Sequence, residues 1–144
     1  GAAALCITTA SKAATLGLKP QVRIVAQASC AQKPEWFTTA PAFAAKTCLD
    51  KAQLSPADID LWEINEAFAA VTMACTKELE IEADKVNVRG GAVAFGHPIG
   101  ASGARILTTL IHSLLQEEKR YGLATLCIGG GEAVALVVEN TQLA

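Results

Sequence analysis

The sequence predicts an α/β domain with a mixed sheet flanked by helices, and three observations carry this prediction. Short apolar runs typical of strands alternate along the chain with helical stripes, a pattern typical of α/β folds. Hydrophobic residues make up 51% of the 144 residues and charged residues 18%, which supports a packed core and argues against disorder. The last two strand-like runs are only a few residues apart, so we expect them to pair antiparallel.

Five segments have the pattern of strands. Each is a short apolar run bounded by turn residues or by a helical stripe. They cover residues 2–9, 22–29, 59–64, 123–128 and 133–138. Together they predict a five-stranded sheet, mostly parallel, with the last strand antiparallel. Residues 92–95, AVAF, form a possible further short strand in an otherwise irregular stretch.

Four segments have the pattern of helices, and the strongest covers about residues 101–118, where six Ile and Leu residues form a broad apolar face. Pro41 suits the first turn of a helix that ends near residue 53. An earlier helix ends near Gly17. A further helix from 66 to about 80 would follow Asn65 as its N-cap.

Charge and composition exclude several classes of function. The net charge is −2 and no basic block occurs, so we expect no nucleic-acid partner. The apolar runs are far shorter than the ~20 residues of a spanning helix, so we expect no membrane span. The chain begins with an apolar run and no recognisable leader, as a fragment or a processed piece would.

The chain has five cysteines, and their spacing argues against a metal site. No CxxC pair and no Cys/His ligand spacing occurs, so we expect no zinc. Free thiols in a reducing compartment are the default interpretation. Core packing is the better interpretation for Cys6, Cys48 and Cys75, whereas Cys30, at a strand end, keeps both interpretations open.

Asn65 lies where a predicted strand ends and a predicted helix begins. Ligands bind at the carboxyl ends of strands in α/β sheets, so the Asn65 amide could hold a water or a carbonyl oxygen there. Spacing alone favours the simpler interpretation of a helix cap. Glu66 would then lie in the first helical turn, where the helix dipole favours a carboxylate.

His97 lies in GGAVAFGHPIGASGAR, residues 90–105, among five glycines. Pro98 pushes His97 out of helical geometry, so we expect it on an extended loop just before the long helix. The glycine spacing matches neither a dinucleotide fingerprint nor a P-loop. The only other histidine, His112, falls on the polar face of the long helix and is expected at the surface. His97 is therefore the candidate catalytic histidine, with an ordinary exposed loop residue as the alternative.

Cys127 precedes a triple glycine, residues 129–131, at the end of an apolar strand. The backbone N–H groups of such glycines could form an oxyanion hole. A thiol beside them could act as an acid or a base if its surroundings tuned its pKa. A cysteine at the end of an apolar strand is also commonly a core residue, and the pattern alone leaves the two interpretations equal.

Taken together, these segments resemble the thiolase family. NEAFA at 65–69 is similar to the asparagine motif of the family, and NVRGGAVAFGHPIGASGAR at 87–105 to its histidine motif. LCIGGGEA at 126–133 is similar to its second-cysteine motif. The three occur in the family's order and spacing, and the opening GAAAL resembles the start of its C-terminal half. The resemblance implies that residues 1–144 form one thiolase C-terminal domain.

The resemblance implies a role for each matching catalytic residue. His97 would activate the nucleophilic cysteine and help to form a first oxyanion hole, and Asn65 would hold the water that completes it. Cys127 would act as acid and base on the substrate's α-carbon or the incoming thiol. The backbone N–H of Gly129 would contribute to a second oxyanion hole.

The resemblance also implies binding residues, and the sequence departs from the family at three places. Ala67 and Phe68 would line the acyl pocket. Arg89 stands where asparagine is usual, and residues 132–133 replace a frequent residue-glycine pair. WFTTAP at 36–41 differs from the commoner MGxGP and slightly favours short-chain substrates.

The implied activity is the condensation of two acetyl-CoA molecules to acetoacetyl-CoA and CoA, or the reverse thiolysis. No metal or cofactor would be needed, because coenzyme A is part of the substrate. A longer 3-ketoacyl-CoA substrate is the first alternative, and a non-enzymatic domain that binds acyl-CoA or a partner is the second.

The nucleophilic cysteine of the family belongs to its N-terminal half, and no stretch here resembles that motif. We therefore expect the chain alone to be inactive and to associate with the missing N-terminal domain. The resemblance implies a homodimer or homotetramer. We expect the protein in the cytoplasm, with mitochondria as the alternative.

Overall fold

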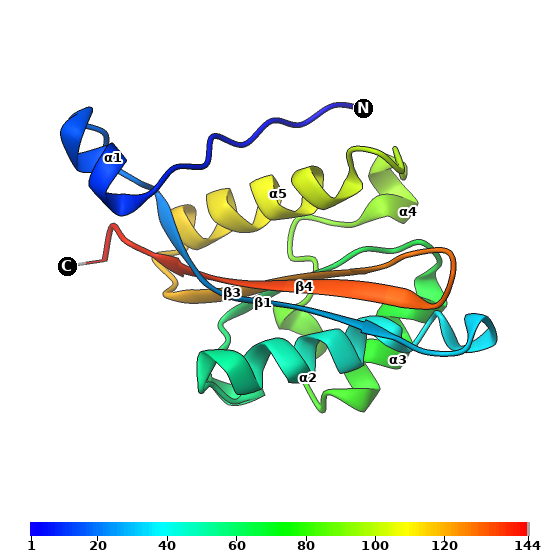
Figure 1. Cartoon of the computed structure of the whole chain (residues 1–144). Helices are drawn as coiled ribbons and strands as arrows, with labels where there is room; N and C mark the ends of the chain where they lie inside the picture. The colour runs from blue at the N-terminus through cyan, green and yellow to red at the C-terminus, as the bar shows by residue number, and fades with distance from the viewer. Residues whose placement is uncertain (144) are drawn as a thin grey trace.

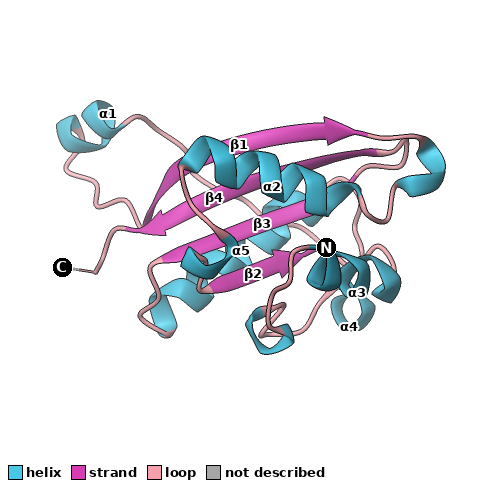
Figure 2. Cartoon of the chain, turned by 90° about the horizontal axis from the view of Figure 1, so that it is seen from below, coloured by secondary structure: helices cyan, strands magenta, loops and turns pink. Residues whose placement is uncertain are grey.

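Four strands form one mixed sheet in the computed structural model, which describes residues 1–143. They are β1 (Val22–Ala31), β2 (Leu61–Ile64), β3 (Tyr121–Cys127) and β4 (Glu132–Asn140), in the order β1-β4-β3-β2 (Figure 2). β4 is antiparallel to both of its neighbours, and β2 is parallel to β3. Three strands thus run in one direction and the last runs against them. The α/β class and the antiparallel last strand are confirmed.

The predicted fifth strand is absent, so the sheet has four strands rather than five. Residues 2–9 carry no strand pairing, and Cys6 is exposed rather than part of a core. An apolar run shows that a segment can be buried, but a strand also needs a neighbouring strand edge. Within the described chain β4 and β3 pair on both sides, and neither edge strand pairs with residues 2–9.

Five α-helices connect and flank the strands: α1 (Ala10–Thr15), α2 (Ala40–Ala52), α3 (Ala69–Glu78), α4 (Ala92–Phe95) and α5 (Ser102–Gln116). Short 3-10 turns cover Pro34–Trp36, Pro56–Asp58 and Ala83–Lys85. AVAF is α4 and not a strand, because the N–H groups of Ala94 and Phe95 both turn back to the Gly91 carbonyl.

The helix expected from residue 66 begins three residues later, with Phe68 as its N-cap, so Asn65 is not a helix cap. The Asn65 N–H bonds to the Thr125 carbonyl at 3.0 Å, which continues the β2–β3 pairing one residue beyond β2. The chain is therefore still extended at Asn65, and its side chain is left available for other contacts.

The helices cover the sheet unequally. α2 packs over β1, β4 and β3 on one face, next to α3, and α5 packs over β3 and β2 on the other (Figure 1). Successive side chains of β2 point to opposite faces of the sheet. Trp62 and Ile64 therefore lie in the core beneath α2, whereas Leu61 lies in the core beneath α5. The α5 face of β1 and β4 has no helix of its own.

Gly122 lets α5 approach β3 closely. A Cβ at this position would lie 2.7 Å from the Leu110 Cδ1 and 3.0 Å from the Leu114 Cδ1, and both leucines are fully buried. At Gly103, in the first turn of α5, the nearest atoms to a Cβ would be Leu126 methyl groups at 4.0 Å. Only the first of these two glycines is required by packing.

A buried ion pair also lies between β2 and α5. Glu63 is 1% exposed, and its Oε2 lies 3.8 Å from the Arg105 Nη1. Burial raises the pKa of Glu63 to about 7, while the Arg105 charge opposes the shift and the Glu66 carboxylate adds to it. The 3.8 Å separation is too long for a hydrogen bond, so the pair only partly offsets the desolvation of Glu63.

The two glycines provide a matched test of the α5 packing. We expect Gly122→Ala to lower the free energy of unfolding by about 1–3 kcal/mol, because a buried contact must shift. Gly103→Ala should raise it by about 0.5 kcal/mol through helix propensity. Urea unfolding of both variants measures the difference, and equal effects would contradict the close approach at Gly122.

The buried carboxyl makes stability depend on pH. Because the folded pKa of Glu63 lies above the unfolded value of 4.5, folding is favoured by protonation, and this contribution falls as pH rises through 7. We expect the stability of the wild type relative to Glu63→Gln to fall by about 2 kcal/mol between pH 5 and pH 7.5. Urea unfolding at the two pH values measures this change. The exposed Glu35→Gln is the control, and the same change in both comparisons would refute the assignment.

Candidate active site

The candidate site lies at the edge of the sheet where β2 and β3 end. The parallel register places Ile64 beside Thr125, so Asn65 follows one strand while Leu126 and Cys127 complete its neighbour. This is the carboxyl edge of the only parallel pair in the described chain, which is where ligands bind in α/β sheets. Three motifs far apart in sequence therefore reach this edge from β2, from the loop before α5 and from β3.

Asn65 is completely buried, and its amide is directed at His97. The Asn65 Nδ2 lies 3.4 Å from the His97 Nε2. The Asn65 Oδ1 is buried and has no hydrogen-bond partner among residues 1–143. A buried carbonyl oxygen without a partner is costly, and a bound water would satisfy it.

His97 lies on an exposed loop between α4 and α5, as predicted, and its ring is held from behind. Gly96, with φ of +90°, turns the chain out of α4. The His97 Nδ1 lies 2.6 Å from the hydroxyl of the fully buried Ser102, the first residue of α5. His112 is exposed on α5 as expected, so only one of the two histidines reaches the site.

The bonds of Ser102 determine which nitrogen of His97 carries the hydrogen. The Ser102 hydroxyl donates its one proton to the Pro98 carbonyl at 3.1 Å, so it accepts from the His97 Nδ1. Nε2 of the neutral ring is then unprotonated and accepts from the Asn65 amide. This nitrogen points away from the Ser102 support and can take a proton, as a general base must.

Cys127 ends β3 and is half-buried. Burial raises the pKa of its thiol, so the thiol is protonated at neutral pH and a thiolate formed there is strongly basic. Cys75 is fully buried on α3, and burial raises its pKa to about 12, while Cys48 is also buried. Core packing is confirmed for these two. Cys30 donates to the Ala40 carbonyl at 3.1 Å, which gives it a structural contact.

Gly129 lies in the turn that joins β3 to β4. The turn is closed by the Ile128 N–H on the Glu132 carbonyl at 2.7 Å and by the Gly131 N–H on the Ile128 carbonyl at 3.1 Å. Gly131 has a φ of +99°, and a Cβ there would lie 2.5 Å from the Gln32 carbonyl oxygen. Gly129 is an exposed residue, and its N–H has no partner among residues 1–143, so this N–H is free to bind an oxygen atom.

The two predicted pocket residues, Ala67 and Phe68, lie two and three residues after Asn65. Ala67 is half-buried and packs against the α2 core, and its N–H bonds to the Asn65 carbonyl at 3.0 Å. Phe68 is largely exposed and meets the Phe37 ring edge-on, with centroids 6.2 Å apart. The exposed Phe68 thus packs against a half-buried Phe37, three residues after Asn65.

The structure brings Asn65 and His97 into direct contact. Cys127 ends the neighbouring strand β3, Gly129 follows it, and neither forms a hydrogen bond to Asn65 or His97. Sequence reasoning missed Ser102, although its position five residues after His97 at a helix start was a usable signal. Glu66 lies before α3 rather than in its first turn, and it accepts from the Val93 N–H at 2.9 Å. Arg89 pairs with Glu117 at 2.9 Å, away from these groups.

Residues 1–143 contain neither a metal-binding cluster nor a membrane-spanning helix. No group of three His, Cys, Asp or Glu side chains is arranged there to hold a metal ion. No helix in that part of the chain is long and apolar enough to cross a membrane.

Known proteins share both the sequence and the fold. The model of the thiolase C-terminal domain matches residues 18–140. Acetyl-CoA acetyltransferases from Allochromatium vinosum and Escherichia coli K12 are each 52% identical over 97% of the chain. The crystal structure of the Bacillus anthracis acetyl-CoA acetyltransferase superposes on 92% of the chain with a TM-score of 0.89 at 45% identity.

The matches also define how much of such a protein the chain represents. It spans 36% of each of the two bacterial relatives and 34% of the Bacillus anthracis chain, so about two thirds of each lies outside it. The family model matches more than half of the chain and carries the description of a C-terminal domain. The chain therefore belongs to the thiolase family, and what it contains is the C-terminal domain.

Proposed function

We propose that this domain supplies the acid, base and oxyanion-binding groups of an acetyl-CoA acetyltransferase. The observation that carries the proposal is the contact between Asn65 and the unprotonated His97 Nε2, with Ser102 supporting the other ring nitrogen. The names of the 52% identical relatives support the same activity. The substrates would be acetyl-CoA thioesters, and coenzyme A would leave as a product.

In the first half-reaction, His97 Nε2 takes the proton of a nucleophilic thiol supplied by the N-terminal portion. The thiolate attacks the acetyl-CoA carbonyl, the C–S bond to coenzyme A breaks, and the acetyl group stays on the nucleophile. The protonated Nε2–H and a water held at Asn65 donate to the thioester oxygen as its negative charge develops. The departing coenzyme A thiolate takes the proton of Cys127.

In the second half-reaction, the Cys127 thiolate removes a proton from the methyl carbon of a second acetyl-CoA. Its raised pKa makes it a strong base for this weakly acidic carbon. The enolate attacks the acetyl group on the nucleophile, the new carbon–carbon bond forms, and the nucleophile leaves as a thiolate that takes back the proton held by His97 Nε2. The exposed Gly129 N–H can donate to the oxygen of the tetrahedral intermediate.

A longer 3-ketoacyl-CoA substrate is a second candidate, because the exposed Phe68, packed on Phe37, presents an apolar ring three residues after Asn65. Such a ring could contact an acyl chain. Rates with acetoacetyl-CoA and with a long 3-ketoacyl-CoA, measured on the same enzyme, separate the two: a higher kcat/KM for the long substrate would favour the second candidate.

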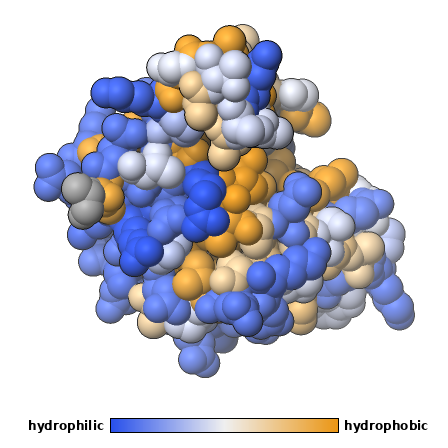
Figure 3. Space-filling view, turned by 60° about the vertical axis from the view of Figure 1, so that its left-hand side comes forward, coloured by the Kyte–Doolittle hydropathy of each residue, from blue (hydrophilic) through white to orange (hydrophobic). Residues whose placement is uncertain are grey.

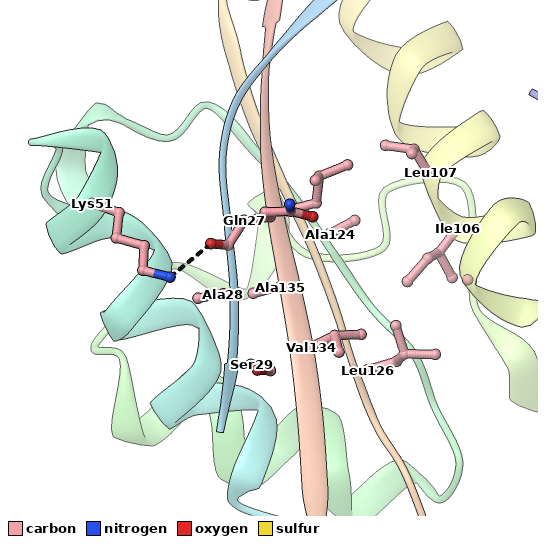
Figure 4. A pocket seen from close by; sticks show the side chains of 12 residues that line it. Gln27, Ala28, Ser29, Lys51, Ile106, Leu107, Ala124, Leu126, Val134 and Ala135 are labelled. Atoms are coloured by element: carbon pink, nitrogen blue, oxygen red, sulfur yellow. Dashed lines mark hydrogen bonds between the residues drawn. The ribbon is translucent and has the colours of Figure 1, made fainter. Parts of the chain in front are cut away.

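An open apolar groove supports the presence of a partner domain. Apolar residues gather in hollows of the surface (Figure 3), and a cavity of about 610 Å³ lies between α5 and the uncovered strands (Figure 4). Leu107 lines it from α5, and Leu126, Val134 and Leu136 line it from the sheet. An apolar surface of this kind favours association. We propose that the N-terminal portion found in the relatives packs here, within a dimer or tetramer.

The catalytic role of His97 can be tested in a hybrid that joins this chain to the N-terminal portion of the Escherichia coli relative. We expect thiolysis of acetoacetyl-CoA by the hybrid and none by the chain alone. His97→Ala should lower kcat at least a hundredfold, because a general base is lost. His112→Ala on the exposed face of α5 is the matched control. A near-silent His97→Ala would instead favour a domain that only binds acyl-CoA or a partner.

The groove can be tested by placing a charge in it. Val134 is 36% exposed on the groove side of β4, so Val134→Lys should leave the isolated domain folded. We expect it to weaken binding to the separately expressed N-terminal portion at least tenfold by calorimetry, because a lysine would be buried without a partner. Met73→Lys, at a residue 73% exposed on α3, is the control. Equal weakening by both would show that the groove is not the contact surface.

A further inference from the structure

The contact between Asn65 and His97 joins two segments that are far apart in sequence and needs support from elsewhere. Asn65 lies between β2 and α3, and His97 lies on an exposed loop that follows α4. At 3.4 Å the hydrogen bond between them is long and therefore weak. Ser102 orients the His97 ring, but it makes no hydrogen bond to the segment that carries Asn65.

Asn87 ties the two segments together on one side of Asn65. Its Oδ1 accepts from the Ile64 N–H and its Nδ2 donates to the Ile64 carbonyl, both at 2.9 Å. Its backbone N–H donates to the Trp62 carbonyl at 2.8 Å. The side chain therefore pairs with the free edge of β2 as a neighbouring strand would, at the residue directly before Asn65.

The backbone of Asn87 shows why asparagine suits this position. Its φ of +49° lies in the left-handed region, which asparagine tolerates better than most residues. Val86 forms an isolated parallel bridge with Trp62, so the chain runs along β2 for one residue and then turns. Because the backbone turns away from β2 at Asn87, the Asn87 side chain, rather than the backbone, forms the next pair of hydrogen bonds to β2, at Ile64.

Glu66 ties the same segments together on the other side of Asn65. Its Oε2 accepts from the Val93 N–H at 2.9 Å, in α4. Gly91 leaves the space for this carboxylate, since a Cβ there would lie 2.3 Å from it. One tie thus precedes Asn65 and the other follows it, and both lead to the segment that ends in His97.

We propose that Asn87 and Glu66 are positioning residues that set the separation of Asn65 and His97. Neither reaches the exposed Nε2 side of His97, so both act through the backbone that carries the two site residues. The geometric part of the proposal stands on these contacts alone, and its kinetic part rests on the proposed thiolase function.

Asn140 provides a matched control for Asn87. It is also buried and bonds backbone groups through its side chain, donating to the Lys119 carbonyl at 3.0 Å and accepting from the Gln142 N–H at 2.9 Å. It lies at the end of β4 away from the site, beside Gln21 and Val22. Loss of either asparagine should lower the melting temperature, but only Asn87 should affect the site.

The experiment combines kinetics of the hybrid enzyme with NMR of the chain. In the hybrid, we expect Asn87→Ala to lower kcat at least tenfold with KM for acetoacetyl-CoA changed less than threefold, and Asn140→Ala to keep kcat within twofold. Glu66→Ala should lower kcat likewise, and Glu66→Gln, which can still accept from the Val93 N–H, should restore most of it. In the chain, the nuclear Overhauser effect between the Asn65 amide and the His97 ring should be lost in Asn87→Ala and kept in Asn140→Ala.

The outcomes separate the two proposals. If Asn87→Ala and Asn140→Ala lower kcat equally at equal loss of melting temperature, and the Overhauser effect persists in both, the positioning role is wrong while the thiolase function stands. If the unmodified hybrid has no thiolase activity, the proposed function fails. The Overhauser effect between Asn65 and His97, measured in the chain for Asn87→Ala and Asn140→Ala, then decides the positioning role by itself.

Discussion

The parallel pairing of β2 with β3 is the constraint on which the rest of the site depends. Fifty-six residues separate the end of β2 at Ile64 from the start of β3 at Tyr121. A parallel pair requires a crossover connection, and here α3, α4 and α5 all lie within it. The crossover returns over the sheet as α5 and brings the start of that helix to the strand ends. Asn65, His97 and Cys127 therefore share one edge of the sheet.

The polar groups between β2 and α5 are arranged as a row beneath this edge. Ser102 and Arg105 are three residues apart on α5, so they lie on one face of the helix. Ser102 forms a hydrogen bond to His97, whereas Arg105 pairs with the buried Glu63. Burying these groups is costly, and several of their atoms have no partner within residues 1–143. These buried polar groups thus lower the stability of the domain between β2 and α5, the region that supports the candidate catalytic histidine.

Much of this arrangement could be predicted from the sequence, because its signals are local. The apolar stripe of α5 and the proline after His97 each depend on near neighbours, and both gave the observed structure. The predictions that proved wrong concern segments whose conformation depends on contacts with residues distant in sequence. AVAF could pair as a strand or close a helical turn, and the extended Gly91 decided for the turn. Asn65 had the pattern of a helix cap, but the Thr125 carbonyl held its backbone in the sheet.

In the site, too, the residues carried by local motifs were predictable, whereas the contacts between distant segments were not. The motifs named Asn65 and His97, and the structure confirms that they meet. The support behind them was not predictable, because the bonds of Ser102 and Asn87 depend on how the crossover is folded. The prediction of a strand at residues 2–9 was wrong for a related reason. The apolar pattern describes one segment, whereas a strand forms only when a second segment pairs with it.

The position of β4 has a consequence for how the domain is made. β4 is the last of the four described strands to be synthesised, yet it lies between β1 and β3, and within residues 1–143 no other strand pairs with β1. During synthesis β1 is made long before its partner: Ala31, the last residue of β1, pairs with Glu132, which lies 101 residues later. Closing so long a loop is slow, and the apolar residues of β1 remain without a strand neighbour meanwhile. The sheet is therefore complete only once β4 has been made, and until then the apolar residues of β1 and its unpaired edge are exposed to aggregation.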